Sequence, residues 1–112
     1  MDIIVLIDNL YISSNVINPE KVIVNISNNK FDDSAFLICL NNNSGNLMDI
    51  YYVQELKKSY INICNLIVLA VCHNKADARQ VCTFIIERFM QEYNDFSDFK
   101  SKVGLVRWVK ND

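Results

Sequence analysis

The sequence contains few of the residues that usually shape turns: its 112 residues include two glycines and one proline. Gly45 and Gly104 are isolated, so the chain lacks the glycine-rich loop that cradles phosphates in nucleotide-binding proteins. Its longest apolar runs, Ile3–Ile7 and Leu66–Cys72, are much shorter than the ~20 residues that span a bilayer. These scarcities lead us to expect no nucleotide cofactor and no membrane partner.

Basic charge and histidine are also scarce. The formal net charge is −2, whereas proteins that bind nucleic acids usually carry a strong basic excess. His73 is the single histidine and the four cysteines form no C-x-x-C pair, so the grouped ligands typical of a zinc site are missing from the sequence. We therefore expect no nucleic-acid partner, no metal site and no cofactor.

The four cysteines, Cys39, Cys64, Cys72 and Cys82, lie in apolar segments. Such surroundings are typical of reduced, buried thiols, and the chain starts without the positively charged segment of a secretory signal. Because thiols stay reduced in the cytoplasm, the sequence predicts a cytoplasmic protein. A scaffold held by two disulfides is the alternative.

Apolar residues and asparagine are abundant. Hydrophobic residues make up 51% of the chain and charged residues 21%, as in packed globular domains. The length is typical of one domain, so we predict a single globular domain over residues 1–112. The 14 isoleucines lie mostly in segments with a predicted buried face, whereas the 15 asparagines concentrate in turns and helix caps. There they replace glycine and proline.

Apolar runs rich in isoleucine and valine predict five strands, at residues 2–7, 22–26, 35–40, 66–72 and 103–109. Apolar side chains at steps of three and four predict two main helices, at residues 47–63 and 75–94, although residues 47–53 also suit a strand. Asn46 and Asn74 precede the two helices as N-caps. The order β-β-β-α-β-α-β predicts an α+β fold with a mixed sheet of about five strands.

Cys72 lies between a predicted strand and a predicted helix, where a helix dipole would lower the pKa of its thiol. Arg79 follows, and the segment is similar to the strand–loop–helix of cysteine phosphatases. Six residues separate Cys72 from Arg79, one more than in those enzymes, and no glycine shapes the loop. We therefore expect Cys72 to be a buried structural thiol, His73 to be a turn residue, and the chain to hold no catalytic residue.

Asp8 follows the first predicted strand, and the segment Ile3–Asn9 resembles the first strand of PIN/NYN-type metal-dependent ribonucleases. The resemblance implies a ribonuclease in which Asp8, Asp49 and Asp77 converge at the carboxyl ends of the strands to hold a divalent cation. It covers this strand alone. The Gly-Asp-rich signature of these enzymes, expected near Cys72–Asp77, is absent.

Charge is divided unevenly along the chain. Residues 1–56 hold seven acidic and two basic residues, a net charge of −5, whereas residues 57–112 have a net charge of +3. The acidic, asparagine-rich loops of the first half would attract a basic protein. We predict the following partner-binding residues in these loops and in the segment after them: Asp32, Asp33, Asn41, Asn42, Asn43, Asp49 and Glu55.

These features predict a small non-catalytic domain that binds a protein. Among such domains, a bacterial immunity protein or antitoxin that neutralises a basic, nuclease-type toxin fits the size and the acidic loops. The ribonuclease is one alternative. A structural or oligomerising adaptor is another, and it would use an unpaired edge strand or an exposed apolar face. Phe96, Phe99 and Trp108 suit either the core or an interface, and homo-oligomerisation stays open.

Overall fold

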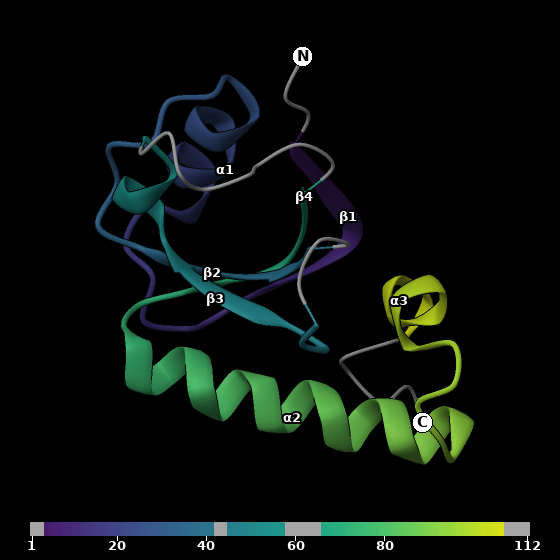
Figure 1. Cartoon of the computed structure of the whole chain (residues 1–112). Helices are drawn as coiled ribbons and strands as arrows, with labels where there is room; N and C mark the ends of the chain where they lie inside the picture. Colours follow the sequence, from purple (N-terminus) through teal and green to yellow (C-terminus); the bar gives the residue numbers. More distant parts are fainter. Residues whose placement is uncertain (1–3, 42–44, 58–65, 107–112) are drawn as a thin grey trace.

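Four strands form a mixed sheet that lies between two helices (Figure 1). The computed structural model describes residues 4–41, 45–57 and 66–106. The strands are β1 (Ile4–Ile12), β2 (Phe36–Leu40), β3 (Asp49–Tyr52) and β4 (Leu66–Cys72). They lie in the order β1-β4-β2-β3, with β1 parallel to β4 and the other neighbours antiparallel. The described residues thus form a single α+β domain, and the predicted mixed sheet is confirmed.

The strand β4 lies between β1 and β2 and is buried along nearly its whole length. Its run without polar residues is expected for a strand that is covered on both faces. Cys39 of β2 pairs with Val68 whereas Ile38 pairs with Ala70, so Leu69 is an extra residue on β4, as in a β-bulge. The bulge places two successive side chains of β4 in the same core cluster.

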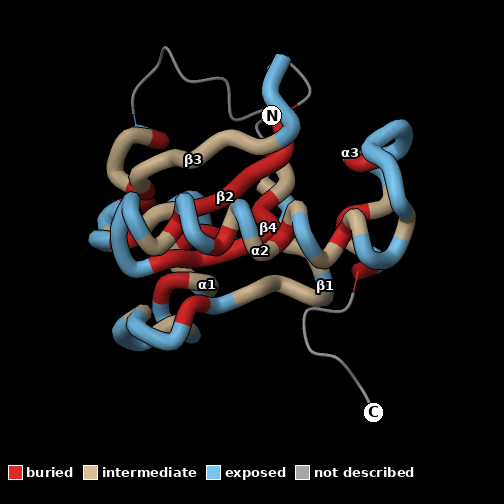
Figure 2. Tube along the Cα trace, turned by 90° about the horizontal axis from the view of Figure 1, so that it is seen from below, coloured by how far each residue is buried: buried red, intermediate tan, exposed pale blue. Residues whose placement is uncertain are grey.

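The helices α1 (Pro19–Ser27) and α2 (Lys75–Tyr93) cover opposite faces of the sheet (Figure 1). Figure 2, which views the molecule from the α2 side, shows that β2 and β4 are largely buried. Ile26 belongs to the core cluster under α1 and Phe89 to the cluster under α2, and both are fully buried. Burying one such side chain stabilises the fold by about 1.5–3 kcal/mol.

Among the described residues, no helix is long and apolar enough to cross a membrane.

The helix α2 confirms the prediction for residues 75–94 within one residue. The side chain of Asn74 accepts a hydrogen bond from the N–H of Asp77 (2.8 Å), and the carboxylate of Asp77 accepts one from the N–H of His73 (3.0 Å). This arrangement resembles a capping box, except that the second donor is His73, the residue before the N-cap. The helix ends at Asn94, whose φ of 64° is left-handed, as is common at helix C-termini.

The prediction of a strand at residues 22–26 is wrong, because these residues lie within α1. Val22 and Ile26 are four residues apart and both buried, whereas Val24 between them is exposed, which is the burial pattern of a helix. Pro19 is the first helical residue, where its fixed φ suits a helix start. The β-branched composition favours a strand, but packing on the sheet decides the structure.

The prediction of a helix at residues 47–63 is wrong at residues 49–52, where the strand alternative is confirmed. Residues 49–52 are the strand β3, and Val53–Lys57 form a short 3-10 helix, η1; residues 58–63 lie outside the described residues. Antiparallel pairing places Ile50 opposite Ile38. Tyrosine and isoleucine favour strands, and pairing with β2 outweighs the helical spacing of the segment.

The described part of the chain ends with two short helices, α3 (Phe99–Lys102) and η2 (Val103–Leu105), so the prediction of a strand is wrong for residues 103–106. Val103 and Val106 are buried, and the side chain of Asn9 in β1 donates a hydrogen bond to the carbonyl of Val106. Residues 107–109 lie outside the described residues. The described part of the chain therefore contains four strands rather than the predicted five, and their order differs from the prediction.

Phe99 belongs to the core. It is buried, and its ring lies edge-on to that of Phe89, with 4.8 Å between ring centroids. Phe96 is partly exposed and stacks on the same ring at 6.0 Å. Trp108 lies outside the described residues. The aromatic side chains near the end of α2 thus hold α3 against that helix.

Candidate functional site

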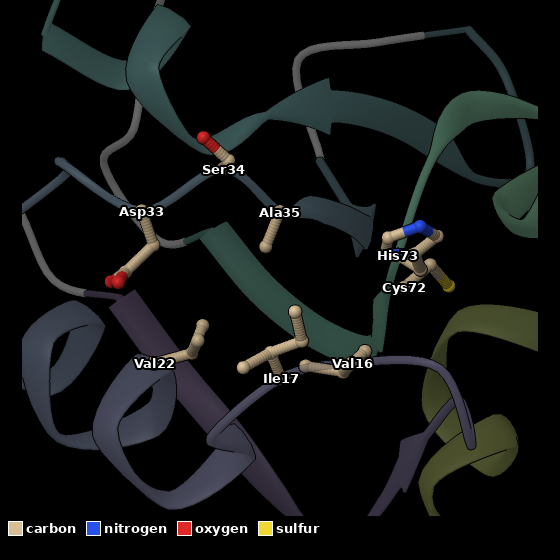
Figure 3. Close-up of a pocket in the computed structure, with 8 residues that line it drawn as sticks. All are labelled: Val16, Ile17, Val22, Asp33, Ser34, Ala35, Cys72 and His73. Atoms are coloured by element: carbon tan, nitrogen blue, oxygen red, sulfur yellow. The ribbon is translucent and has the colours of Figure 1, made fainter.

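A cavity of about 230 Å³ lies at the end of the sheet where the parallel strands β1 and β4 finish (Figure 3). Ligands of open α/β sheets commonly bind beyond the carboxyl ends of parallel strands. The cavity is lined by Val16, Ile17, Val22, Asp33, Ser34, Ala35, Cys72 and His73. We call these eight residues the cavity end of the sheet.

Apolar side chains line the middle of the cavity (Figure 3). Val22 comes from α1 and Ala35 from the segment that leads into β2, and both are buried. Ile17 lies on the loop between β1 and α1 and is 76% exposed. The next residue, Asn18, adopts a left-handed backbone with φ 50°, which asparagine tolerates better than most residues. This turn leads into Pro19 and leaves Ile17 at the rim of the cavity.

The polar groups lie at the two ends of the cavity. Figure 3 shows Asp33 at one end and His73 at the other, with the hydroxyl of Ser34 turned away. The carboxylate of Asp33 accepts a hydrogen bond from the side-chain amide of Asn25 in α1 (3.1 Å). Among the described residues that line the cavity, Asp33 alone carries a fixed charge. The cavity therefore combines an apolar middle with one anionic end.

Cys72 is one of the residues that line the cavity, and its thiol is buried. Its side chain is fully buried, and Figure 3 shows its sulfur turned away from the cavity. Burial, with smaller contributions from Asp77 and Cys82, raises the pKa of the Cys72 thiol to about 12. The thiol stays protonated at neutral pH, and the prediction that Cys72 is buried at the end of a strand is confirmed. The described cysteines Cys39, Cys72 and Cys82 are free, and Cys64 lies outside the described residues.

The predicted partner-binding residues divide between two ends of the β2–β3 hairpin. Asp32 and Asp33 precede β2, and Glu55 follows β3, whose last residue, Tyr52, pairs with Phe36 at the start of β2. These three acidic residues therefore share the end of the sheet that holds the cavity. The opposite end of the hairpin begins at the last residue of β2. That residue is four residue steps from Phe36, a distance of roughly 13 Å at the rise of a strand.

Asp32 is held in place next to the cavity end. Its carboxylate forms an ion pair with Lys57, and its carbonyl accepts a hydrogen bond from the side chain of Gln54 (3.1 Å). The side chain of Lys57, through its hydrogen bond to the carboxylate and its charge, holds the pKa of Asp32 below its ordinary value. Because both side chains are largely exposed, the pair adds little stability. It links η1 to the acidic loop.

The remaining predicted residues lie at the opposite end of the hairpin. Asn41 is only 8% exposed; its side chain donates to the hydroxyl of Tyr51 (3.0 Å) and its carbonyl accepts from Lys100 (3.1 Å). Asp49 is half-buried at the start of β3 and accepts from the side chain of Asn46 (2.9 Å). We call the four residues Asn41, Asp49, Tyr51 and Lys100 the Asn41 end. Asn42 and Asn43 lie outside the described residues.

The three aspartates of the predicted ribonuclease site are not brought together. The strand β1 continues past Asp8 to Ile12, so Asp8 does not lie at its carboxyl end. Asp49 is opposite Cys39, near the amino end of β4, whereas Asp77 follows the carboxyl end of β4 and caps α2. Within residues 4–41, 45–57 and 66–106, no three acidic, histidine or cysteine side chains are grouped to hold a metal ion. The convergence that the resemblance implies is therefore wrong.

Sequence reasoning missed the apolar part of the site. Val16, Ile17 and Ala35 were not predicted to have any role, because a cavity depends on contacts between segments far apart in the chain. The one local indication is Asn18-Pro19, a turn signal directly after two apolar residues.

No protein-family model matches the chain, and neither a curated protein nor a solved structure matches it.

Proposed function

We propose that this chain is a non-catalytic domain that binds a protein partner through the cavity end and the neighbouring acidic residues Asp32 and Glu55. The observation that carries the proposal is the position of Ile17, which is 76% exposed and lines the apolar middle of a cavity with Asp33 at one end. Single exposed apolar residues are common. An apolar anchor beside a pocket with polar groups around it is typical of interface hot spots.

The charge of this surface favours a basic partner. Asp32, Asp33 and Glu55 belong to the half of the chain with a net charge of −5, and they share one end of the sheet. Complementary charge speeds association and selects partners. A bacterial, cytoplasmic immunity protein or antitoxin that blocks a basic, nuclease-type toxin is the class of binding protein that we propose. The buried, protonated thiol of Cys72 supports a role without catalysis.

The test is binding to the product of the neighbouring gene, purified as an inactive variant. Asp32→Lys with Asp33→Lys reverses charge at the proposed surface. We expect the association rate to fall by about tenfold and its salt dependence to weaken, because charges at the rim of an interface act mainly on association. Surface plasmon resonance at several salt concentrations measures both effects.

The matched control is Glu87→Lys with Glu92→Lys, which changes the net charge equally on exposed positions of α2, the helix on the other face of the sheet. This control should bind as the unmodified chain does. Equal loss in both variants, or binding unchanged by Asp32→Lys with Asp33→Lys, would contradict the proposal. Asp33→Asn alone preserves the hydrogen bond from Asn25 and serves where the double variant unfolds.

An oligomerising adaptor is a second candidate, favoured by the position of β1. This nine-residue strand is at one edge of the sheet, and Val5 on it is 45% exposed. Edge strands of this kind pair with other chains unless they are protected. Sedimentation equilibrium distinguishes the two: an adaptor would form dimers that Val5→Lys dissociates, whereas the proposed binding domain stays monomeric in both forms.

A further inference from the structure

We propose that the cavity at the cavity end receives one long basic side chain, arginine or lysine, from the protein partner. This inference rests on the proposed function and names the group that the cavity recognises. Three properties of the cavity carry it: its size, its apolar middle and its single fixed charge.

The size of the cavity fits one side chain. Its volume is about 230 Å³. A cavity of ~150 Å³ is enough to hold benzene, whereas pockets that enclose drug-sized ligands measure ~300–1,000 Å³. The cavity therefore has room for a single extended group and is small for a nucleotide or another large cofactor.

The lining matches the two parts of a long basic side chain. Val16, Ile17, Val22 and Ala35 form an apolar surface for the methylene groups, and lysine and arginine commonly cover apolar surface with these groups while their charged ends stay hydrated. Asp33 lies at one end, where its carboxylate accepts hydrogen bonds and already accepts one from Asn25. Hydrogen bonds between charged partners are roughly twice as strong as neutral ones.

The same lining disfavours other occupants. An acidic side chain would face the carboxylate of Asp33, and among the lining residues only His73, at the opposite end, could oppose its charge. A purely apolar side chain would fill the middle and leave the carboxylate of Asp33 without a new partner. Charge complementarity therefore selects a basic side chain, in agreement with the acidic residues Asp32 and Glu55 at the same end of the sheet.

The test uses the full chain and small probes, so it does not depend on the partner. Backbone amide chemical shifts are followed by NMR during titration with N-acetyl-arginine amide or N-acetyl-lysine amide, and with N-acetyl-norleucine amide, which has a similar stem without charge. We expect one or both basic probes to shift residues 16–17, 33–35 and 73 with a Kd on the order of 1 mM. The norleucine probe should bind at least about threefold more weakly.

Two variants separate the contributions of charge and space. Asp33→Asn removes the charge and keeps an oxygen that accepts from Asn25, so it should lower the affinity for the basic probes to that for norleucine amide. Ala35→Leu places a larger side chain in the cavity wall and should abolish binding of all three probes. Glu87→Gln, on the exposed side of α2, is the matched control and should leave all affinities unchanged.

Equal binding of norleucine amide and the basic probes would overturn the inference, as would tighter binding of N-acetyl-glutamate amide or shifts spread away from the cavity. If the neighbouring gene product binds through this end while the basic probes leave it unshifted, the inference fails and the proposed function stands. If the basic probes bind as expected and that gene product does not, recognition of a basic side chain stands and the proposed function fails.

Discussion

The two ends of the β2–β3 hairpin carry similar residues and use them differently. At the Asn41 end, Asn41 is buried and forms hydrogen bonds with Tyr51 and Lys100. At the cavity end, Asp33 borders a cavity and Ile17 is exposed beside it. Polar residues at the Asn41 end hydrogen-bond to neighbouring elements, whereas at the cavity end Asp33 borders a cavity. Composition alone does not distinguish these two roles, because both ends are rich in asparagine and aspartate.

The difference between the Asn41 end and the cavity end indicates which polar residues of a small domain contribute to stability and which are available for binding. A buried amide that bonds to neighbouring elements contributes to stability, since losing it leaves a partner unsatisfied. An acidic residue beside an open apolar cavity has room for a ligand. We therefore expect substitutions at the Asn41 end to change the free energy of unfolding, and substitutions at the cavity end to change binding.

The largest effect is expected for Asn41→Ala, which removes the donor to the Tyr51 hydroxyl in a partly buried site. We expect a loss of about 2 kcal/mol in the free energy of unfolding, because a buried polar group without a partner costs about 1–3 kcal/mol. Urea unfolding followed by circular dichroism measures the loss.

The matched variant at the other end is Asn25→Ala. Asn25 donates to Asp33 from a half-buried position on α1. Water can replace this hydrogen bond and alanine favours the helix, so the loss should stay below about 0.5 kcal/mol. A loss at Asn25→Ala as large as that at Asn41→Ala would contradict the distinction between the two ends.

A smaller effect is expected at the turn that presents Ile17. Asn18 has a φ of 50°, and left-handed backbone costs most side chains ~1–2 kcal/mol, a cost that asparagine lowers. Asn18→Ala should therefore lower the free energy of unfolding by about 1 kcal/mol, measured by thermal and urea unfolding. The control is Asn15→Ala in the same loop, because Asn15 does not have a left-handed φ. This variant should change the free energy of unfolding by less than about 0.5 kcal/mol. A larger loss at Asn15→Ala would mean that loop contacts, and not the backbone of Asn18, fix this turn.

The smallest effect concerns the ion pair beside the cavity end. Lys57 holds the pKa of Asp32 below its ordinary value of 3.8. The folded state therefore favours the ionised carboxylate, a contribution that is present above the ordinary value and lost as the pH falls through the lowered pKa. Lys57→Met should return the pKa of Asp32 to its ordinary range, as seen in carboxyl ¹³C shifts against pH. An unchanged pKa would contradict the role of Lys57.

Parts of this fold follow from the sequence because local and tertiary preferences agree. The run Leu66–Cys72 is short, apolar and rich in β-branched residues, and it is a buried strand. The helix α2 has its N-cap in its own sequence, because the side chain of Asn74 accepts a hydrogen bond from the N–H of Asp77. At residues 22–26 and 47–57 the two preferences disagree. Valine and isoleucine suggest a strand where packing makes α1, and helical spacing suggests a helix where pairing with β2 makes β3.

The site could be predicted only in part for a related reason. Acidic character is local, so Asp32, Asp33 and Glu55 could be selected from the chain, and they share one end of the sheet. The separation of Asn41 and Asp49 from them depends on the antiparallel pairing of β2 and β3, which a sequence pattern does not reveal. The cavity combines a loop, α1 and the segments that flank β2 and β4, and Ile17 gains its importance from that assembly alone.

The most direct test of a binding surface at the cavity end compares two exposed apolar residues. Ile17 is 76% exposed at the cavity, and Leu105 is 72% exposed in η2. Isothermal titration calorimetry with the neighbouring gene product should show at least about fivefold weaker binding for Ile17→Ala, since anchors at an interface contribute about 1 kcal/mol or more. It should show unchanged binding for Leu105→Ala. Unchanged binding for Ile17→Ala, or loss of binding for Leu105→Ala, would contradict the account.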